Sequence, residues 1–228
     1  MTENFNPFLT EYHTPFGTTP FHLIKTEHFE PAMEEGMKAH NRDVDAIVNN
    51  SDEPTFANTI VALEKSGALL DRATTVFGNL LSAETSDELE VLAERMMPRL
   101  SEHSNNISLN ERLFARIKRV YDETKQGALS QEDYMLLQNT YNSFIRNGAN
   151  LTLEQKERFR QLSAELSVLT LKFSQNNLKE TNRYELLLTP EQTDGLPTSA
   201  LDAYAQAAKD KNQEGYLVTL QAPSFVPF

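Results

Sequence analysis

Histidines are the first residues to consider for chemistry, because the chain has no cysteine. Disulfides, thiol nucleophiles and thiolate metal sites are therefore excluded. No two histidines are four residues apart, so no single helix offers the two-histidine face that zinc enzymes use. The five are His13, His22, His28, His40 and His103. His40 falls on an apolar helical stripe with Met33, Met37, Val44 and Ile47, which favours a core or edge histidine over a metal ligand.

Two acidic pairs are the other candidates for a metal site. Asp43 with Asp45, or Glu34 with Glu35, has the oxygen ligands that hard cations prefer. Side chains one or two positions apart on a helix point in different directions, however, so a solvated helix face is the favoured interpretation. Nucleophile-elbow, phosphate-loop, dinucleotide and EF-hand motifs are all absent from the sequence. We therefore predict no catalytic, cofactor-binding or metal-binding residue within this chain.

Composition excludes two classes of partner. The chain has 228 residues, with 33 acidic and 21 basic side chains, and a net charge of -12. Such a charge repels nucleic acid and anionic lipid, so we expect neither nucleic acid nor membrane as a partner. The N-terminal sequence MTENFNPFLTEYH lacks the basic start and apolar core of a signal peptide. Together with the absence of cysteine, this predicts a cytoplasmic protein.

Apolar periodicity predicts a mainly α fold of long antiparallel helices. Residues 1–30 hold prolines among aromatic residues, which indicates an extended arm packed on another surface. The first helical stripe begins at Pro31. Ser51 or Asp52 is the expected cap of one long second helix that runs to Leu81, with Gly67 and Thr74 on its seam where a neighbouring helix approaches.

Four further helices follow in the helical domain, which we expect over residues 31–182. One starts near Ser86 and should kink or end at Pro98. The next runs from about Asn110 and closes at Gly127. Ser130 with Asp133 starts another, and a Thr152–Gln155 capping box starts the longest. The apolar stripe of that longest helix is expected to face the core, and its members are Phe159, Leu162, Leu166, Leu169 and Phe173.

Residues 183–228 change in character. Residues 184–188 and 215–220 have strand composition, and residues 198–210 form a helical pattern between them. A small strand–helix–strand segment is therefore expected at this end of the helical domain. The chain ends on two prolines among Phe225, Val226 and Phe228, an apolar ending that water solvates poorly. We expect the natural chain to continue beyond it.

Read as whole strings, four segments are similar to one family, the thimet-oligopeptidase-like zinc metallopeptidases. They are NPFLTEYHTPFGTTPFHLIKTEHFEPAMEEGM (6–37), PTFANTIVALEKSGALLDRATTVFGNLLSAETSDEL (54–89), FIRNGANLTLEQKERFRQLSAELSVLTLKFSQN (144–176), and GLPTSAL (195–201) with GYLVTLQAPSFVPF (215–228). The bacterial peptidyl-dipeptidase and oligopeptidase A branch is the part of the family that they resemble. Their order and spacing extend over nearly the whole chain.

The resemblance implies the N-terminal helical region of a peptidase that acts on short peptides, with release of C-terminal dipeptides favoured over internal cleavage. In the family, zinc is bound by an H-E-x-x-H helix and a downstream glutamate, and the motif glutamate acts as general base. None of these residues is present, so zinc is expected only in a full-length parent, whose missing C-terminal catalytic region would be this chain's partner. The chain alone is expected to be inactive, forming one wall of the substrate channel.

Two other hypotheses stay open from the sequence alone. Composition and periodicity alone favour a free-standing helical interaction module, either an adaptor or a scaffold, because amphipathic helices are far commoner than peptidase walls. The apolar ending and the ordered family-like strings argue against it. An enzyme whose site is built from scattered residues is the third hypothesis, and the few glycines and unclustered histidines argue against that one.

Overall fold

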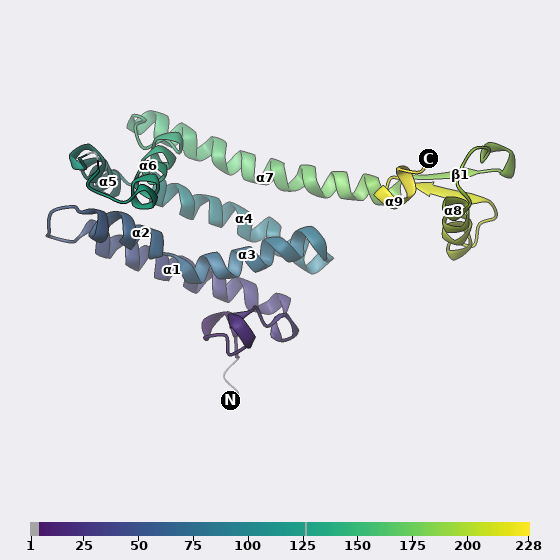
Figure 1. Cartoon of the computed structure of the whole chain (residues 1–228), viewed down its shortest axis with the longest axis horizontal. Helices are drawn as coiled ribbons and strands as arrows, with labels where there is room; N and C mark the ends of the chain where they lie inside the picture. The colour runs from purple at the N-terminus through teal and green to yellow at the C-terminus, as the bar shows by residue number, and fades with distance from the viewer. Residues whose placement is uncertain (1–4, 126) are drawn as a thin grey trace. The chain divides into compact units, whose positions relative to one another are not determined.

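The computed structural model describes residues 5–125 and 127–228, and its fold is mainly α, as predicted (Figure 1). The chain divides into two compact units, Met1–Val168 and Leu169–Phe228. Helix α7 (Leu153–Arg183) is continuous through the point where the two units divide. Among the described residues, no helix is long and apolar enough to cross a membrane.

Helix α1 (Thr26–Val48) begins five residues before the predicted start at Pro31. The Lys25 amide donates to His28 Nδ1 at 3.1 Å, which supplies one of the caps that a helix start needs. Pro31 removes one amide donor from the second turn. Burial of Phe29 and Met33, each at most 1% exposed, holds this turn against the neighbouring elements. The arm ahead of α1 contains three single 3-10 turns, Pro7–Leu9, Pro15–Gly17 and Phe21–Leu23.

The single long helix predicted up to Leu81 is wrong. It is divided into a π turn (Phe56–Val61), α2 (Ala62–Lys65) and α3 (Ala68–Ala83). The cap is Thr55 rather than Ser51 or Asp52, since the Asn58 amide donates to Thr55 Oγ1 at 3.1 Å. Gly67 has a φ of 73°, a left-handed conformation that breaks the helix between α2 and α3.

A close helix approach involves Gly36 on α1, a residue that the predicted seam did not include. A Cβ atom added at Gly36 would lie 2.8 Å from Leu70 Cα on α3, so only glycine fits without a backbone shift. Helices α1 and α3 lie side by side along much of their length (Figure 1). The glycine therefore sets how closely the two helices pack.

The next four helices start where their capping residues predicted. They are α4 (Asp87–Ser108), α5 (Glu111–Glu123), α6 (Gln131–Arg146) and α7. The Ser86, Asn110 and Ser130 side chains each accept a backbone amide at the helix start, and Thr152 and Gln155 form the reciprocal bonds of the expected capping box. Helix α4 continues through Pro98 rather than ending there, and α5 ends at Glu123, before Gly127.

The core of the first unit is apolar and continuous across several helices. Its buried members are Val44, Ile47, Val48, Ile60, Leu113, Phe114, Ile117, Val120, Leu137, Phe144 and Ala149. Tyr121 and Tyr141 stack beside it with ring centroids 4.0 Å apart. Helices α1, α5 and α6 thus each contribute buried apolar side chains to this core.

The described part of the N-terminal arm is fixed to α1 and α3 through Phe8. This side chain is fully buried, and its ring centroid lies 5.1 Å from that of Phe29. Asn6 Nδ2 donates to the His28 carbonyl at 2.8 Å, and Arg72 on α3 donates to the Phe8 carbonyl. The Arg72 guanidinium also lies 4.9 Å from the centroid of the Tyr12 ring, a cation–π contact.

The second unit contains the strand–helix–strand arrangement that the sequence predicted. Strands β1 (Glu185–Leu188) and β2 (Tyr216–Thr219) pair antiparallel, with Leu188 opposite Tyr216, and α8 (Thr198–Asp210) lies between them in the chain. Its small core contains Leu188, Ala200, Tyr204 and Val218. A final short helix, α9 (Ala222–Phe225), lies within the apolar ending of the chain. Tyr204 Oη donates to the Ser224 carbonyl at 2.6 Å and holds α9 in place.

The apolar stripe of α7 does not face a core as predicted. Leu162, Leu166, Leu169 and Phe173, which we call the α7 stripe, are all exposed, and Phe159 is half-buried. Helical periodicity correctly groups these residues on one side of the helix. It carries no information on which segment covers that side, and within each unit these side chains are exposed.

Candidate functional site

A pair of histidines is the most distinctive polar contact in the described chain. His40 Nδ1 on α1 lies 3.1 Å from His103 Nε2 on α4, and the two rings meet edge to face with centroids 5.1 Å apart. One nitrogen donates a hydrogen bond and the other accepts it, so the contact requires at least one imidazole to be unprotonated. His103 is 8% exposed and His40 is half-buried.

Burial controls the charge of both rings. It lowers the pKa of His40 below its ordinary value of about 6.5, and the nearby Asp43 carboxylate opposes part of that effect. Burial also lowers the pKa of His103, and the charge that His40 would carry lowers it further. Burial therefore favours the neutral form of both rings. His40 is a satisfied edge histidine, in agreement with the sequence interpretation.

The histidine pair borders a cavity of about 790 Å³ between α1, α3, α4 and α6. The described residues that line it include Glu64 and Asp71 but no lysine or arginine. Gly67 closes one side, and a Cβ atom added there would lie 2.9 Å from His40 Nδ1. The left-handed turn at Gly67 thus allows α3 to start directly beside the histidine ring.

The lowered pKa values of His40 and His103 predict that the stability of the fold depends on pH. Because both folded-state pKa values are lowered, the unfolded chain binds protons that the folded chain does not, and acid favours unfolding. The stabilisation is fully present above pH 6.5 and is lost as the pH falls below that value towards the folded-state pKa values. We expect His103→Gln to flatten the dependence of the urea midpoint on pH between about 7.5 and 5.5.

An exposed histidine gives the control for this measurement. His22→Gln in the N-terminal arm removes a ring that does not contact the pair. This variant should keep the full slope of the urea midpoint against pH. An unchanged slope in His103→Gln would show that the histidine pair does not control acid sensitivity.

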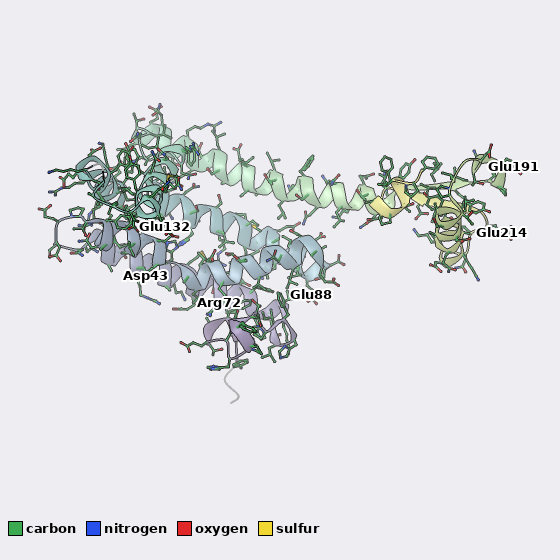
Figure 2. The ribbon with its side chains drawn as sticks, in the orientation of Figure 1. Asp43, Arg72, Glu88, Glu132, Glu191 and Glu214 are labelled. Atoms are coloured by element: carbon green, nitrogen blue, oxygen red, sulfur yellow. The ribbon has the colours of Figure 1, made fainter. Side chains whose placement is uncertain are left out.

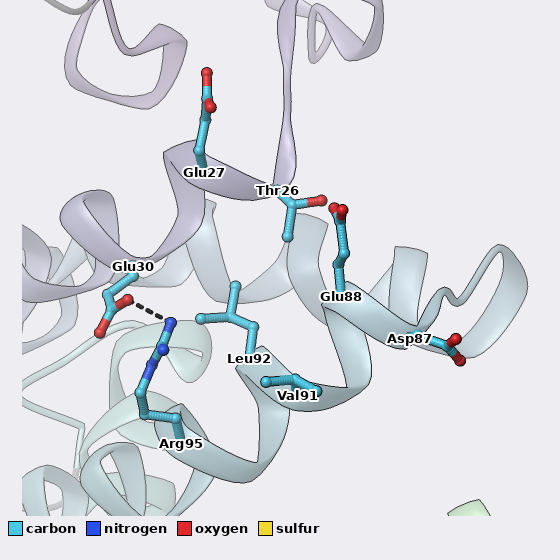
Figure 3. Close-up of a pocket in the computed structure, with 8 residues that line it drawn as sticks. All are labelled: Thr26, Glu27, Glu30, Asp87, Glu88, Val91, Leu92 and Arg95. Carbon is cyan, nitrogen blue, oxygen red and sulfur yellow. Dashed lines mark hydrogen bonds and ion pairs between the residues drawn. The ribbon is translucent and has the colours of Figure 1, made fainter.

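A second cavity, of about 440 Å³, lies between the starts of α1 and α4 and is strongly acidic (Figure 3). Arg95 Nη2 donates to Glu30 Oε2 at 2.6 Å across it. Asp87 and Glu88 occupy the first turn of α4, where carboxylates stabilise the positive end of the helix dipole. Figure 3 shows the carboxylates pointing in different directions rather than converging on one point. Ion pairing and helix capping therefore account for this cluster.

The acidic pairs proposed from the sequence are likewise accounted for by local interactions. Glu34 Oε1 accepts from Arg99 Nη2 at 2.7 Å, which holds the pKa of that carboxyl below its usual range, and Glu35 pairs with Arg42 at 3.1 Å. Asp43 and Asp45 are exposed, and Asp43 Oδ2 lies 3.5 Å from the Gly67 amide. Within the first unit, the labelled carboxylates of Asp43, Glu88 and Glu132 lie at separate places (Figure 2).

The part of the chain that is described contains no three-ligand centre that could bind a metal ion. Within residues 5–125 and 127–228, no three His, Asp or Glu side chains are close enough together to hold an ion. The histidine pair contributes two nitrogens, and sequence reasoning missed it because its members are 63 positions apart. The described residues therefore do not fit the zinc that the family resemblance implies.

Comparison with known proteins identifies relatives of this chain. No protein-family model matches the chain. Among curated proteins, however, the chain is a homologue of dipeptidyl carboxypeptidases and oligopeptidases A, which are thimet-oligopeptidase-family metallopeptidases, and the resemblance predicted from the sequence strings is confirmed.

Three relatives illustrate the match. Dipeptidyl carboxypeptidase of Salmonella typhimurium is 35% identical over 210 residues, which is 92% of this chain and 31% of that protein. Oligopeptidase A of Escherichia coli is 30% identical over 223 residues, covering 97% of this chain and 32% of that protein. A protein named probable cytosolic oligopeptidase A from Arabidopsis thaliana is 26% identical over 233 residues, with coverage of 97% and 32%. The chain thus spans about a third of the length of the curated relatives it matches.

Proposed function

We propose that this chain is the N-terminal helical part of a zinc-dependent peptidase that cleaves short peptides. The observation that carries the proposal is homology over nearly the whole chain to proteins named as peptidases. We propose release of C-terminal dipeptides as the activity, because identity is 35% to the dipeptidyl carboxypeptidases and 30% to the bacterial oligopeptidases A. Internal cleavage of short peptides is the second candidate.

In this proposal, residues 31–182 form one wall of the substrate channel and residues 183–228 lead into the catalytic region. The long helices of the first unit are suited to a wall, because apolar contacts and caps hold them in register along their length. Zinc and its ligands are supplied by the remainder of the parent chain.

Charge and compartment follow from the same proposal. The net charge of -12 would make this wall unfavourable for acidic peptides, whereas neutral and basic peptides would enter more readily. We propose the cytoplasm as the location of the parent protein, because the chain has no cysteine.

The native coding sequence tests this assignment directly. The reading frame is expected to continue past the Phe228 codon for several hundred codons and to encode H-E-x-x-H with a glutamate downstream. That expectation follows from a match to only 31% of the dipeptidyl carboxypeptidase length. A stop codon directly after Phe228 would contradict the proposal, and a free-standing helical interaction module would take its place.

A further inference from the structure

The α7 stripe is a row of four large apolar side chains that are exposed in the described structure. Leu162, Leu166, Leu169 and Phe173 are 47%, 63%, 62% and 74% exposed. They are spaced by four, three and four residues, which places them on one side of a helix. Because all four lie on one continuous helix, their alignment follows from the helix period alone.

On other sides of α7, several polar side chains are buried or half-buried. The buried position in its first turns is Lys156, whose Nζ donates to Glu111 Oε1 on α5 at 2.9 Å. Ser163 and Ser167 are half-buried. A helix whose only role was to complete the described unit would turn its leucines inward and its lysine outward. Helix α7 keeps its leucines in water, so its sequence favours a further partner for that side.

The spacing and chemistry of the stripe indicate the kind of partner. Alternating steps of four and three residues form the seam along which two helices pack side by side. From Leu162 to Phe173 this seam is about 17 Å long, or three helical turns. Glu165 and Lys172, which lie nearby, carry opposite charges, so the stripe has no charged surface of one sign that would select a polyelectrolyte. An apolar helix face fits it best.

We propose that the α7 stripe packs against an apolar helix in the part of the parent chain outside residues 1–228. This inference rests on the proposed function, since it requires the longer parent. The length of the relatives supports this occupant over a second copy of the chain. The chain corresponds to 31% of a dipeptidyl carboxypeptidase, so most of such a protein lies outside these residues and is tethered to α7. A tethered helix reaches the stripe at a high effective concentration.

The absence of cysteine allows a direct test. Leu166→Cys introduces a thiol on the stripe, and Gln161→Cys introduces one at an exposed polar position one and a half turns away on another side of the same helix. Each variant is made in the 228-residue chain and in the full-length parent. Modification by a maleimide reagent is followed over time by mass spectrometry of the peptide that contains the new cysteine.

We expect the thiol of Leu166→Cys to react at least roughly tenfold more slowly in the parent than in the 228-residue chain, because a packed site must open before it reacts. The thiol of Gln161→Cys should react at similar rates in both. Equal rates for Leu166→Cys in the two proteins would overturn the proposal. Protection of Leu166→Cys that appears in the 228-residue chain as its concentration rises would assign the stripe to a second copy instead, and would also overturn it.

The outcome of the labelling experiment can be distinguished from the outcome of the tests of the proposed function. Labelling reports only on packing of α7, so a parent without peptidase activity could still protect the stripe. Conversely, an active peptidase with a freely labelled stripe would retain the proposed function and contradict this inference alone. If the coding sequence shows that no longer parent chain exists, both the proposed function and this inference are contradicted.

Discussion

Replacing Phe8 with alanine is expected to lower the free energy of unfolding of the first unit by about 3 to 5 kcal/mol. The ring is fully buried and packs between the arm and the two helices α1 and α3, with Phe29 at 5.1 Å and Phe77 in turn 5.3 Å from Phe29. Its removal leaves a cavity in this aromatic cluster or releases the arm, and either change loses the buried apolar area.

Loss of this anchor should also weaken the polar contacts around it. The Asn6 side chain accepts the Phe8 amide at 3.0 Å and donates to the His28 carbonyl, so the arm is hydrogen-bonded where it is most deeply buried. We expect limited proteolysis of the Phe8→Ala variant to cut within residues 10–25 well before it cuts within the helices. Circular dichroism against urea concentration gives the change in stability.

Phe16 provides a matched control in the same arm. Its side chain is fully exposed in the turn Pro15–Gly17, so Phe16→Ala should change the free energy of unfolding by less than about 0.5 kcal/mol. Equal and small effects of the two substitutions would contradict the described docking of the arm.

Signals that lie within a few residues of each other were readable from the sequence. Ser86, Asn110, Ser130 and Thr152 mark helix starts because a side-chain oxygen placed there accepts an amide two or three residues later. The strand–helix–strand segment was predictable for the same reason, since period and composition change within short windows. These interactions depend on local geometry, which a sequence specifies directly.

Features that depend on distant partners were missed or misread. Gly67 sits on an apolar pattern that spans the break between α2 and α3, and only the left-handed backbone shows that the helix stops there. Gly36 is required by Leu70, which lies on a different helix. His40 and His103 meet because α1 and α4 pack together, and neither histidine carries a local signal of the other.

The α7 stripe shows a further limit of reasoning from periodicity. The pattern correctly predicts a helix with one apolar side, but burial of that side depends on a partner segment. The assignment of a peptidase function likewise depends on more than the periodicity of this chain. The family strings connect the chain to peptidases, whereas its described residues form no three-ligand metal centre.

The most direct test of the peptidase assignment compares two proteins in one assay. The full-length parent and the 228-residue chain are incubated at equal molar concentration with a short peptide that has a free carboxyl end, with and without a chelator, and the products are identified by mass. We predict that the parent releases C-terminal dipeptides, that the chelator abolishes this activity and that added zinc restores it. The 228-residue chain should cleave no faster than buffer. Metal-dependent cleavage that follows the 228-residue chain through successive columns, or a metal-loaded parent that cleaves no peptide, would contradict the account.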